Sequence, residues 1–280
     1  MTKQSREALI TILMLAKSLN KNLFSNPDLI PTRNGYGEGL VEAGKKDKNV
    51  VVLCCDLKDS TRSAAFAKKF PDRFVECGVA EQNMMGLAAG MANYGKVPFT
   101  VSYAVFSPGR NWDQVRVSVC YGESNVKIAA AHAGISVGPD GATHQALEDI
   151  ASVRALPNLT VLVPCDSIET KKATIAAAKT EGPMYIRFAR EKTPVITTSR
   201  TSFEIGKARV FRTGIDATFV AAGPMVYEAL LAAECIAGNA KAISTLLARY
   251  PEIAARVKTS KLHGHSMERA QETIKWTPAK

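Results

Sequence analysis

Short apolar runs alternate with longer amphipathic stretches along most of the chain. The runs are rich in valine and isoleucine, and they fall at 50–55, 74–79, 97–103, 127–133, 160–164 and 184–188. Helical periodicity fills the intervals at about 62–69, 80–93, 111–120, 146–155 and 167–180. This alternation predicts β-α-β units, and so a doubly wound α/β domain whose parallel sheet has helices on both faces.

The two ends of the chain depart from this rhythm. A helix is expected at 6–21, and a second near 35–46. We therefore divide the chain into an N-terminal helical extension (1–30), the doubly wound domain (31–195), a polar linker (196–215) and a partial second α/β domain (216–280). The last contains a predicted strand at 218–222 and a helix at 225–236, followed by too little apolar pattern for a complete second sheet.

Composition and charge narrow the class of protein. With 46% hydrophobic and 22% charged residues, the chain is expected to fold as a globular protein. Its apolar runs are too short to cross a bilayer, and its first residues lack a signal-peptide pattern, so we expect a cytoplasmic protein with no membrane association. The net charge of +10 is spread along the chain without a nucleic-acid-binding module, which favours an anionic small-molecule substrate over nucleic acid.

The cysteines and histidines give no pattern of a metal site. The six cysteines stand in apolar segments without a CxxC pair, which predicts buried, reduced thiols. His263 and His265 form an HxH pair, but no third ligand is close in the sequence, so we expect a solvated loop and no metal.

A set of polar and aromatic residues follows the predicted strands in a definite order. Gly78-Val79-Ala80-Glu81-Gln82-Asn83 spans a strand-to-helix junction, where open α/β sheets bind ligands. A lone glutamate in a first helical turn is ordinarily only a favourable partner of the helix dipole. Here the order continues with Tyr103 and Phe106, then Arg110 with Trp112-Asp113-Gln114, then His132, then the run DGATHQALED that begins at Asp140. Asp56-Leu57 and Ser60 precede the set.

With this ordered set the chain resembles the transketolase family, in particular those members in which the enzyme is split into two polypeptides. The resemblance covers about 32–194 and implies the pyrimidine-binding fold of thiamine diphosphate enzymes. Glu81 matches the glutamate that hydrogen-bonds the cofactor's aminopyrimidine, Phe106 the ring that stacks on it, and Tyr103 and Asp56 neighbouring cofactor-binding positions. Core packing is the plain alternative for the two aromatic residues.

The glutamate's role requires a carboxyl group that can hold a proton at neutral pH. Such a group needs an apolar, water-poor site. The nearby apolar residues that we expect to supply it are Val79, Ala80, Met84 and Met85.

The resemblance also implies a sugar phosphate site. Arg33, Ser60, His132 and Arg190 match phosphate-binding residues, and Asp140 and His144 match residues that bind the hydroxyls of the donor sugar. Guanidinium groups suit a phosphate because they offer several charged donors in one plane. The candidate catalytic residues are Glu81, His144 and His132. Of these, His144 is favoured for proton transfer at the hydroxyls of the sugar. Arg187 is a weaker candidate, because on a strand it would face away from Arg190.

Each of these residues also has a structural interpretation. Arg33 could begin a helix in solvent, Ser60 could be an N-cap, and His132 could be a hydrogen-bonded core histidine. Arg190 could be a surface charge.

The family holds the cofactor's diphosphate through Mg²⁺ on a GDG motif, and the chain contains no GDG. The resemblance therefore implies a partner subunit that carries the diphosphate-binding domain and the Mg²⁺ ligands, in an α2β2 assembly. The family also ends with a complete third α/β domain, from which this chain diverges after Gly238.

The activity implied is transfer of a two-carbon ketol unit between sugar phosphates. A 1-deoxyxylulose-5-phosphate synthase shares most of the set, but Ser60 and His132 favour transketolase. The β subunit of a 2-oxoacid dehydrogenase would lack the DGxTHQ run. A non-catalytic scaffold subunit remains a further alternative, against which Glu81 argues.

Overall fold

The computed structural model describes residues 15–214 and 217–251. Its centre is a six-stranded sheet in the order β3-β2-β4-β5-β7-β6, in which every neighbouring pair is parallel. The strands are β2 (Val50–Cys54), β3 (Phe74–Glu76), β4 (Val97–Tyr103), β5 (Lys127–Ala131), β6 (Thr160–Leu162) and β7 (Met184–Arg187). These are the six predicted strands, and the doubly wound α/β fold is confirmed.

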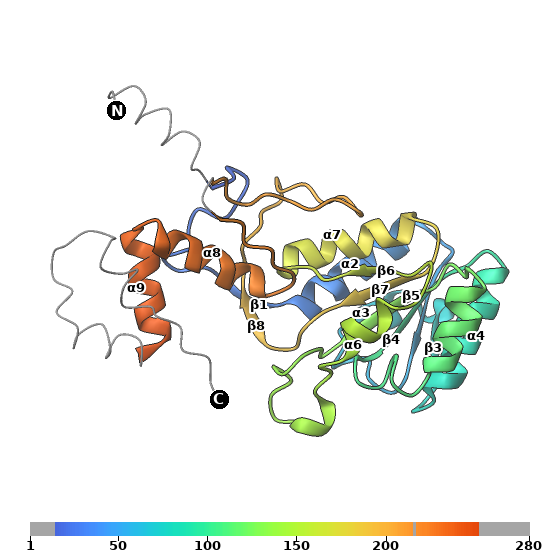
Figure 1. The fold of residues 1–280 in the computed structure, drawn as a ribbon. Coiled ribbons are helices and arrows are strands. Elements are labelled where there is room, and N and C mark those ends of the chain that lie inside the picture. Colours follow the sequence, from blue (N-terminus) through green and yellow to red (C-terminus); the bar gives the residue numbers. More distant parts are fainter. Residues whose placement is uncertain (1–14, 215–216, 252–280) are drawn as a thin grey trace.

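Helices cover both faces of this sheet (Figure 1). On one face lie α2 (Thr32–Lys46), α3 (Ala64–Lys69) and α7 (Ser167–Lys179), and their apolar side chains pack with alternate residues of β2 and β4. On the other face lie α4 (Glu81–Asn93), a π-helix (Val115–Tyr121) and α6 (Asp149–Val153). Because both faces are covered, β2, β4 and β5 are buried along their whole length, and such strands read as continuous apolar runs.

Several helices differ in detail from the prediction. The segment expected as one helix at 111–120 is a short α5 (Trp112–Gln114) that continues into the π-helix. The helix expected at 146–155 is shorter, and α2 begins at Thr32, directly after Pro31. A two-stranded antiparallel sheet of β1 (Leu29–Pro31) and β8 (Lys192–Pro194) was not predicted; it joins the two ends of the doubly wound region.

The expected N-terminal helix is wrong where it can be compared. Residues 15–21 contain a β-bridge and turns and no helix, and the rest of that segment lies outside the described residues. Leu15 bridges Arg212, and Asn20 donates its backbone N–H to Ile196 O at 2.8 Å. The segment is therefore held by residues that follow the sheet, which local periodicity does not reveal.

The region predicted as a linker is irregular, but its first part is fixed to the sheet domain. Ile196 and Thr197 are buried, and their backbone N–H groups donate to Asp166 Oδ2 at 2.8 and 2.5 Å. Lys172 Nζ donates to three backbone oxygens of this region, those of Thr198, Ser199 and Thr201. These contacts attach the connection to α7; the four-part division of the chain itself stays a prediction.

Beyond the connection, only part of the predicted second domain is described. Residues 217–222 form no strand, so the strand expected at 218–222 is wrong; Phe219 and Val220 are exposed, since among the described residues no strand pairs with them. The predicted helix is confirmed as α8 (Met225–Ile236), and α9 (Ala240–Arg249) follows it. A third apolar cluster joins α8 to the N-terminal segment through residues such as Leu19, Leu23 and Leu231.

Figure 1 shows the α8–α9 pair at the opposite end of the molecule from α4. No helix in the described ranges is long and apolar enough to span a bilayer.

Candidate active site

The candidate residues gather at the carboxyl edge of the sheet. Asp56 and Ser60 follow β2, Glu81 follows β3, Tyr103 ends β4, His132 follows β5 and Arg190 follows β7. Arg33 reaches this edge from the first turn of α2, where its backbone N–H donates to Ala189 O at 3.3 Å. In open α/β sheets this is the edge that binds ligands, because loops of neighbouring strands converge there.

Glu81 is buried at the start of α4, with 3% of its surface exposed. Its carboxylate accepts hydrogen bonds from Ser102 Oγ at 3.1 Å and from Arg110 Nη1 at 3.2 and 3.1 Å. The expected apolar surroundings are only partly present. Met84 and Met85 are buried, but Val79 is 69% exposed in the turn before the helix, and a cation faces the carboxylate. Glu81 is thus buried as expected, and the expected apolar surroundings are supplied by Met84 and Met85 but not by Val79.

The aromatic candidates form a continuous stack beside Glu81. The Tyr103 and Phe106 rings are nearly parallel, with centroids 5.9 Å apart, and the His132 ring lies 3.9 Å from Tyr103 on a similar plane. His144 approaches both aromatic rings edge-on, at 5.9 and 5.2 Å. The Arg110 guanidinium lies over the Phe106 ring at 4.0 Å. A planar cation therefore occupies the face of Phe106 while it binds the Glu81 carboxylate.

Arg33 and His132 come together next to this stack. Arg33 Nη1 donates to Ser60 O at 2.9 Å and lies 3.4 Å from His132 Nε2. Arg33 Nε and His132 Nδ1 are buried without a hydrogen-bond partner in the described structure, so His132 is not a satisfied core histidine. Ser60 is not an N-cap either, since the residue before α3 is Ser63.

Arg190 is partly buried near the same cluster. Its Nη1 donates to Val137 O at 2.5 Å and lies 3.6 Å from Glu191. The positive charges of Arg33 and Arg190 act on His132 together, and burial adds to their effect. Burial first, and then these charges, lower the pKa of His132 to about 3. His132 is therefore a neutral ring at physiological pH.

The lowered pKa of His132 predicts an acid-sensitive stability. An unfolded histidine binds a proton below pH 6.5, whereas the folded one does so only near pH 3, so stability is lost as pH falls through this window. We expect the free energy of unfolding to fall by about 2 kcal/mol more in the wild type than in His132→Asn between pH 6.5 and 5. Asparagine suits the left-handed backbone at this position (φ 57°). Urea unfolding at the two pH values measures the difference, and equal losses in both proteins would contradict the prediction.

Two predicted site residues make no side-chain contact there. Asp56 and Asp140 are exposed, and no hydrogen bond or ion pair of either carboxylate is found among the described residues. Asp56 is placed by its backbone, whose N–H donates to Glu76 Oε1 at 2.7 Å. His144 is partly buried, and its Nδ1 lies 2.8 Å from Thr143 Oγ1, which leaves Nε2 free for another partner.

Arg187 is engaged elsewhere. Its Nε lies 2.7 Å from Asp149 Oδ2, to which Tyr185 also donates a hydrogen bond at 3.0 Å. The expectation that Arg187 faces away from Arg190 agrees with this pairing, which accounts for the final aspartate of the DGATHQALED run.

Three residues near Glu81 were not predicted as site residues. Ser102 and Arg110 bind its carboxylate, and Asn111 Nδ2 donates to its backbone oxygen at 3.2 Å. Ser102 could have been suggested by its place directly before Tyr103 at the end of a strand. Arg110 belonged to the ordered set, but without an assigned role.

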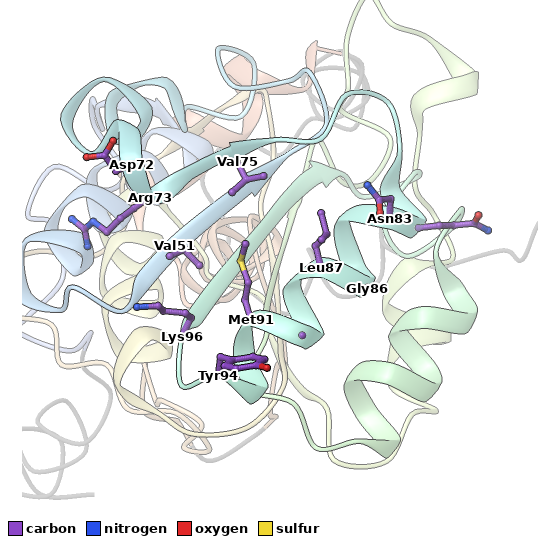
Figure 2. Close-up of a pocket in the computed structure, with 12 residues that line it drawn as sticks. Val51, Asp72, Arg73, Val75, Asn83, Gly86, Leu87, Met91, Tyr94 and Lys96 are labelled. Carbon is purple, nitrogen blue, oxygen red and sulfur yellow. The ribbon is translucent and has the colours of Figure 1, made fainter.

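An open depression of about 830 Å³ lies between α4 and the adjoining strands β2 and β3, and none of the candidate residues lines it. Figure 2 shows Leu87 and Met91 of α4 facing Val51 and Val75 of the sheet edge, with Tyr94 beyond the end of the helix. Leu87 is 41% and Tyr94 90% exposed.

Within the described residues, no group of three or more histidine, cysteine or acidic side chains is placed to hold a metal ion. His263 and His265 lie outside the described part of the chain. All six cysteines are free thiols, as predicted, and four of them are buried.

The family described as "Transketolase, pyrimidine binding domain" matches residues 28–195. The doubly wound sheet with its site at the carboxyl edge agrees with this match, and the chain belongs to the transketolase family as a pyrimidine-binding subunit.

Relatives of this chain include proteins whose names describe parts of a transketolase. A transketolase C-terminal section of Methanocaldococcus jannaschii is 49% identical over 209 residues, which are 74% of this chain and 66% of the relative. A 6-deoxy-6-sulfo-D-fructose transketolase subunit of Clostridium sp. (strain MSTE9) is 41% identical over 207 residues, 74% of this chain and 64% of the relative. The chain thus spans less than two thirds of either relative.

Among solved structures, one described as "Split gene transketolase, inactive beta4 tetramer" superposes with a TM-score of 0.69 at 46% identity. The superposition covers 75% of this chain and 68% of that chain.

Proposed function

We propose that this chain is the pyrimidine-binding subunit of a thiamine diphosphate-dependent transketolase, which transfers a two-carbon ketol unit between sugar phosphates. The observation that carries the proposal is the continuity of the site. A buried carboxylate, Glu81, adjoins an aromatic stack, Tyr103 and Phe106, and the stack leads directly to the guanidinium of Arg33 and the neutral imidazole of His132. Such a site could hold a flat cofactor and an anionic substrate side by side.

The residues present fit the pyrimidine half of the cofactor. Arg110 shows that a flat, hydrogen-bonding group can lie on Phe106 and reach the Glu81 carboxylate at once. Glu81, Phe106 and Tyr103 would hold the aminopyrimidine, with Asp56 at the rim of the site. When bound, thiamine diphosphate supplies the electron sink that the breaking of a bond beside a carbonyl requires.

The chain's own residues would bind the substrate and move its protons. Arg33, His132 and Arg190, with Ser60, would hold the phosphate, and Asp140 and His144 the hydroxyls nearer the reacting carbon. A neutral His132 can accept or donate a hydrogen bond to substrate but carries no extra proton at pH 7. His144 is therefore the better candidate for transferring a proton at a hydroxyl group.

The same geometry predicts a competition between Arg110 and the cofactor. Both need the face of Phe106 and the Glu81 carboxylate, so Arg110 must leave when the pyrimidine binds. We expect Arg110→Ala to tighten thiamine diphosphate binding by about threefold to tenfold, because a half-exposed ion pair no longer has to open. Quenching of tryptophan fluorescence in the assembled enzyme measures the affinity, with Arg154→Ala as control. Weaker binding in Arg110→Ala would show that Arg110 is a ligand of the cofactor.

A separate subunit would carry the diphosphate-binding domain and the Mg²⁺ ligands, and we propose an α2β2 assembly in the cytoplasm. The names of the relatives support a split enzyme, and the solved split-gene relative is described as an inactive tetramer of β chains. Leu87, exposed on α4, and Tyr94, exposed directly after it, offer an apolar surface for packing between subunits. The free thiols agree with a reducing compartment.

Reconstitution tests the proposal. The chain is mixed with a diphosphate-domain subunit, thiamine diphosphate and Mg²⁺, and ketol transfer from xylulose 5-phosphate to ribose 5-phosphate is assayed. We expect activity only in the mixture. A complex that forms but gives no transfer would support the scaffold alternative, and condensation of pyruvate with glyceraldehyde 3-phosphate would identify a 1-deoxyxylulose-5-phosphate synthase.

A further inference from the structure

Arg62 lies beside the phosphate candidates but has no role in the site described so far. It belongs to the turn between β2 and α3, two positions after Ser60. Its Nε donates to Asn34 Oδ1 at 3.1 Å, and Asn34 is the neighbour of Arg33 in the first turn of α2. The arginine is thus bound at the same helix start that supplies Arg33.

The backbone is shaped to hold Arg62 in this place. Its φ of 68° lies in the left-handed region, which is uncommon for a residue with a long side chain and costs about 1 kcal/mol. The turn also presses against α2, since a Cβ on Gly37 would lie 2.6 Å from Arg62 O and 2.8 Å from Arg62 Cβ. Glycine at position 37 therefore permits a contact that any other residue would prevent.

Arg62 is part of one positive cluster with Arg33 and Arg190, which surrounds the neutral ring of His132. Burial lowers the pKa of Arg33, and the charges of Arg62 and Arg190 lower it further. The charge of Arg62 also acts on His132. Among the described residues neither Arg33 nor Arg62 has an ion pair with a carboxylate, and Arg190 has only the exposed Glu191 at 3.6 Å. Guanidinium groups that lie close together without a counter-charge repel one another. A dianion bound between them would replace this repulsion with a net electrostatic attraction.

We propose that Arg62 is a further substrate-binding residue, which contacts the terminal phosphate of the sugar and sets the preference for phosphorylated substrates. The assignment of the sugar phosphate rests on the proposed function. The anion site itself does not, because all four groups belong to this chain.

The variant that tests Arg62 must keep the backbone of the turn. Arg62→Asn removes the charge and tolerates a left-handed φ. Arg62→Lys keeps the charge but loses the planar fork. Arg154→Asn removes an exposed arginine elsewhere and serves as the matched control.

The first measurement is the binding of inorganic phosphate to the isolated chain, followed by NMR or by the increase in melting temperature at constant ionic strength. We expect Arg62→Asn to weaken binding by about tenfold, as for the loss of one charge-assisted hydrogen bond, and Arg62→Lys to weaken it less. Arg154→Asn should bind as the wild type does. Unchanged phosphate binding in Arg62→Asn would overturn the proposal.

The second measurement uses the reconstituted enzyme and two acceptors. With ribose 5-phosphate, Arg62→Asn should raise KM by about tenfold and leave kcat nearly unchanged, whereas with unphosphorylated glycolaldehyde both constants should stay as in the wild type. An equal change with both acceptors would overturn the role in phosphate recognition. If the wild type transfers no ketol unit but phosphate binding still depends on Arg62, the proposed function fails and the anion site stands.

Discussion

Glu81→Gln is expected to reduce ketol transfer by about a thousandfold in the reconstituted enzyme, a typical loss when a positioned acid-base group is removed. Glutamine cannot take up and release a proton, so it cannot serve the aminopyrimidine as a carboxyl group can. Its amide oxygen can still accept hydrogen bonds from Ser102 and Arg110, which bind the carboxylate now. The fold should therefore persist, and kcat is the quantity that reports the change.

A matched variant separates this effect from a general loss of charge. Glu204→Gln neutralises an exposed glutamate whose ion pair with Lys207 lies on the surface, and we expect wild-type activity from it. Circular dichroism and the elution volume of the complex should be the same for both variants. Activity of Glu81→Gln within about threefold of the wild type would contradict the assigned role of Glu81.

The fold followed from the sequence wherever burial is complete on both faces. Strand β4 has the predicted bounds, because a buried parallel strand is apolar at successive positions. The pair β1 and β8 was missed because its strands are three residues long, and β8 carries the polar Lys192 and Thr193. The apolar run at 218–222 was wrongly predicted to be a strand, because residues with high β propensity form a strand only where another strand is available to pair with them.

The site was harder to predict from the sequence, because its charged contacts join segments that lie far apart along the chain. The motif located Glu81, but the cation that faces it comes from the loop after β4, so the expected apolar environment is only partly present. Arg62 gave no signal, since its left-handed backbone, its contact with Gly37 and its hydrogen bond to Asn34 bring it to α2. Hydrophobic periodicity predicts which residues are buried, but it does not predict which charged side chains lie close together.

Asp166→Ala is expected to lower the free energy of unfolding by about 4 kcal/mol, because a buried carboxylate with four donors would be removed. Asp166 is fully buried, and its Oδ1 accepts from Glu169 N at 2.8 Å and from Thr197 Oγ1 at 2.9 Å. Its Oδ2 accepts from the backbone N–H groups of Ile196 and Thr197. One side chain thus caps α7 and holds the connection to α8, and alanine would leave several buried donors without a partner.

Two controls divide this loss into its parts. Asn239→Ala removes a side-chain cap of α9 that also donates from Nδ2 to Glu234 Oε2 of the adjacent α8 at 2.7 Å, but that holds no connecting segment, and should cost about 1 kcal/mol. Thr197→Val removes a single hydroxyl from the Asp166 cluster and should cost about as much. Urea unfolding measures all three variants, and a loss near 1 kcal/mol for Asp166→Ala would mean that Asp166 acts only as a helix cap.

Helix α7 packs closely on α2, since a Cβ on Gly35 would lie 1.8 Å from Ser167 O. Because α2 carries Arg33, a weakened α7 should also raise the KM for phosphorylated substrates. That linked change in KM would show that the connection to α8 supports the anion site as well as the fold.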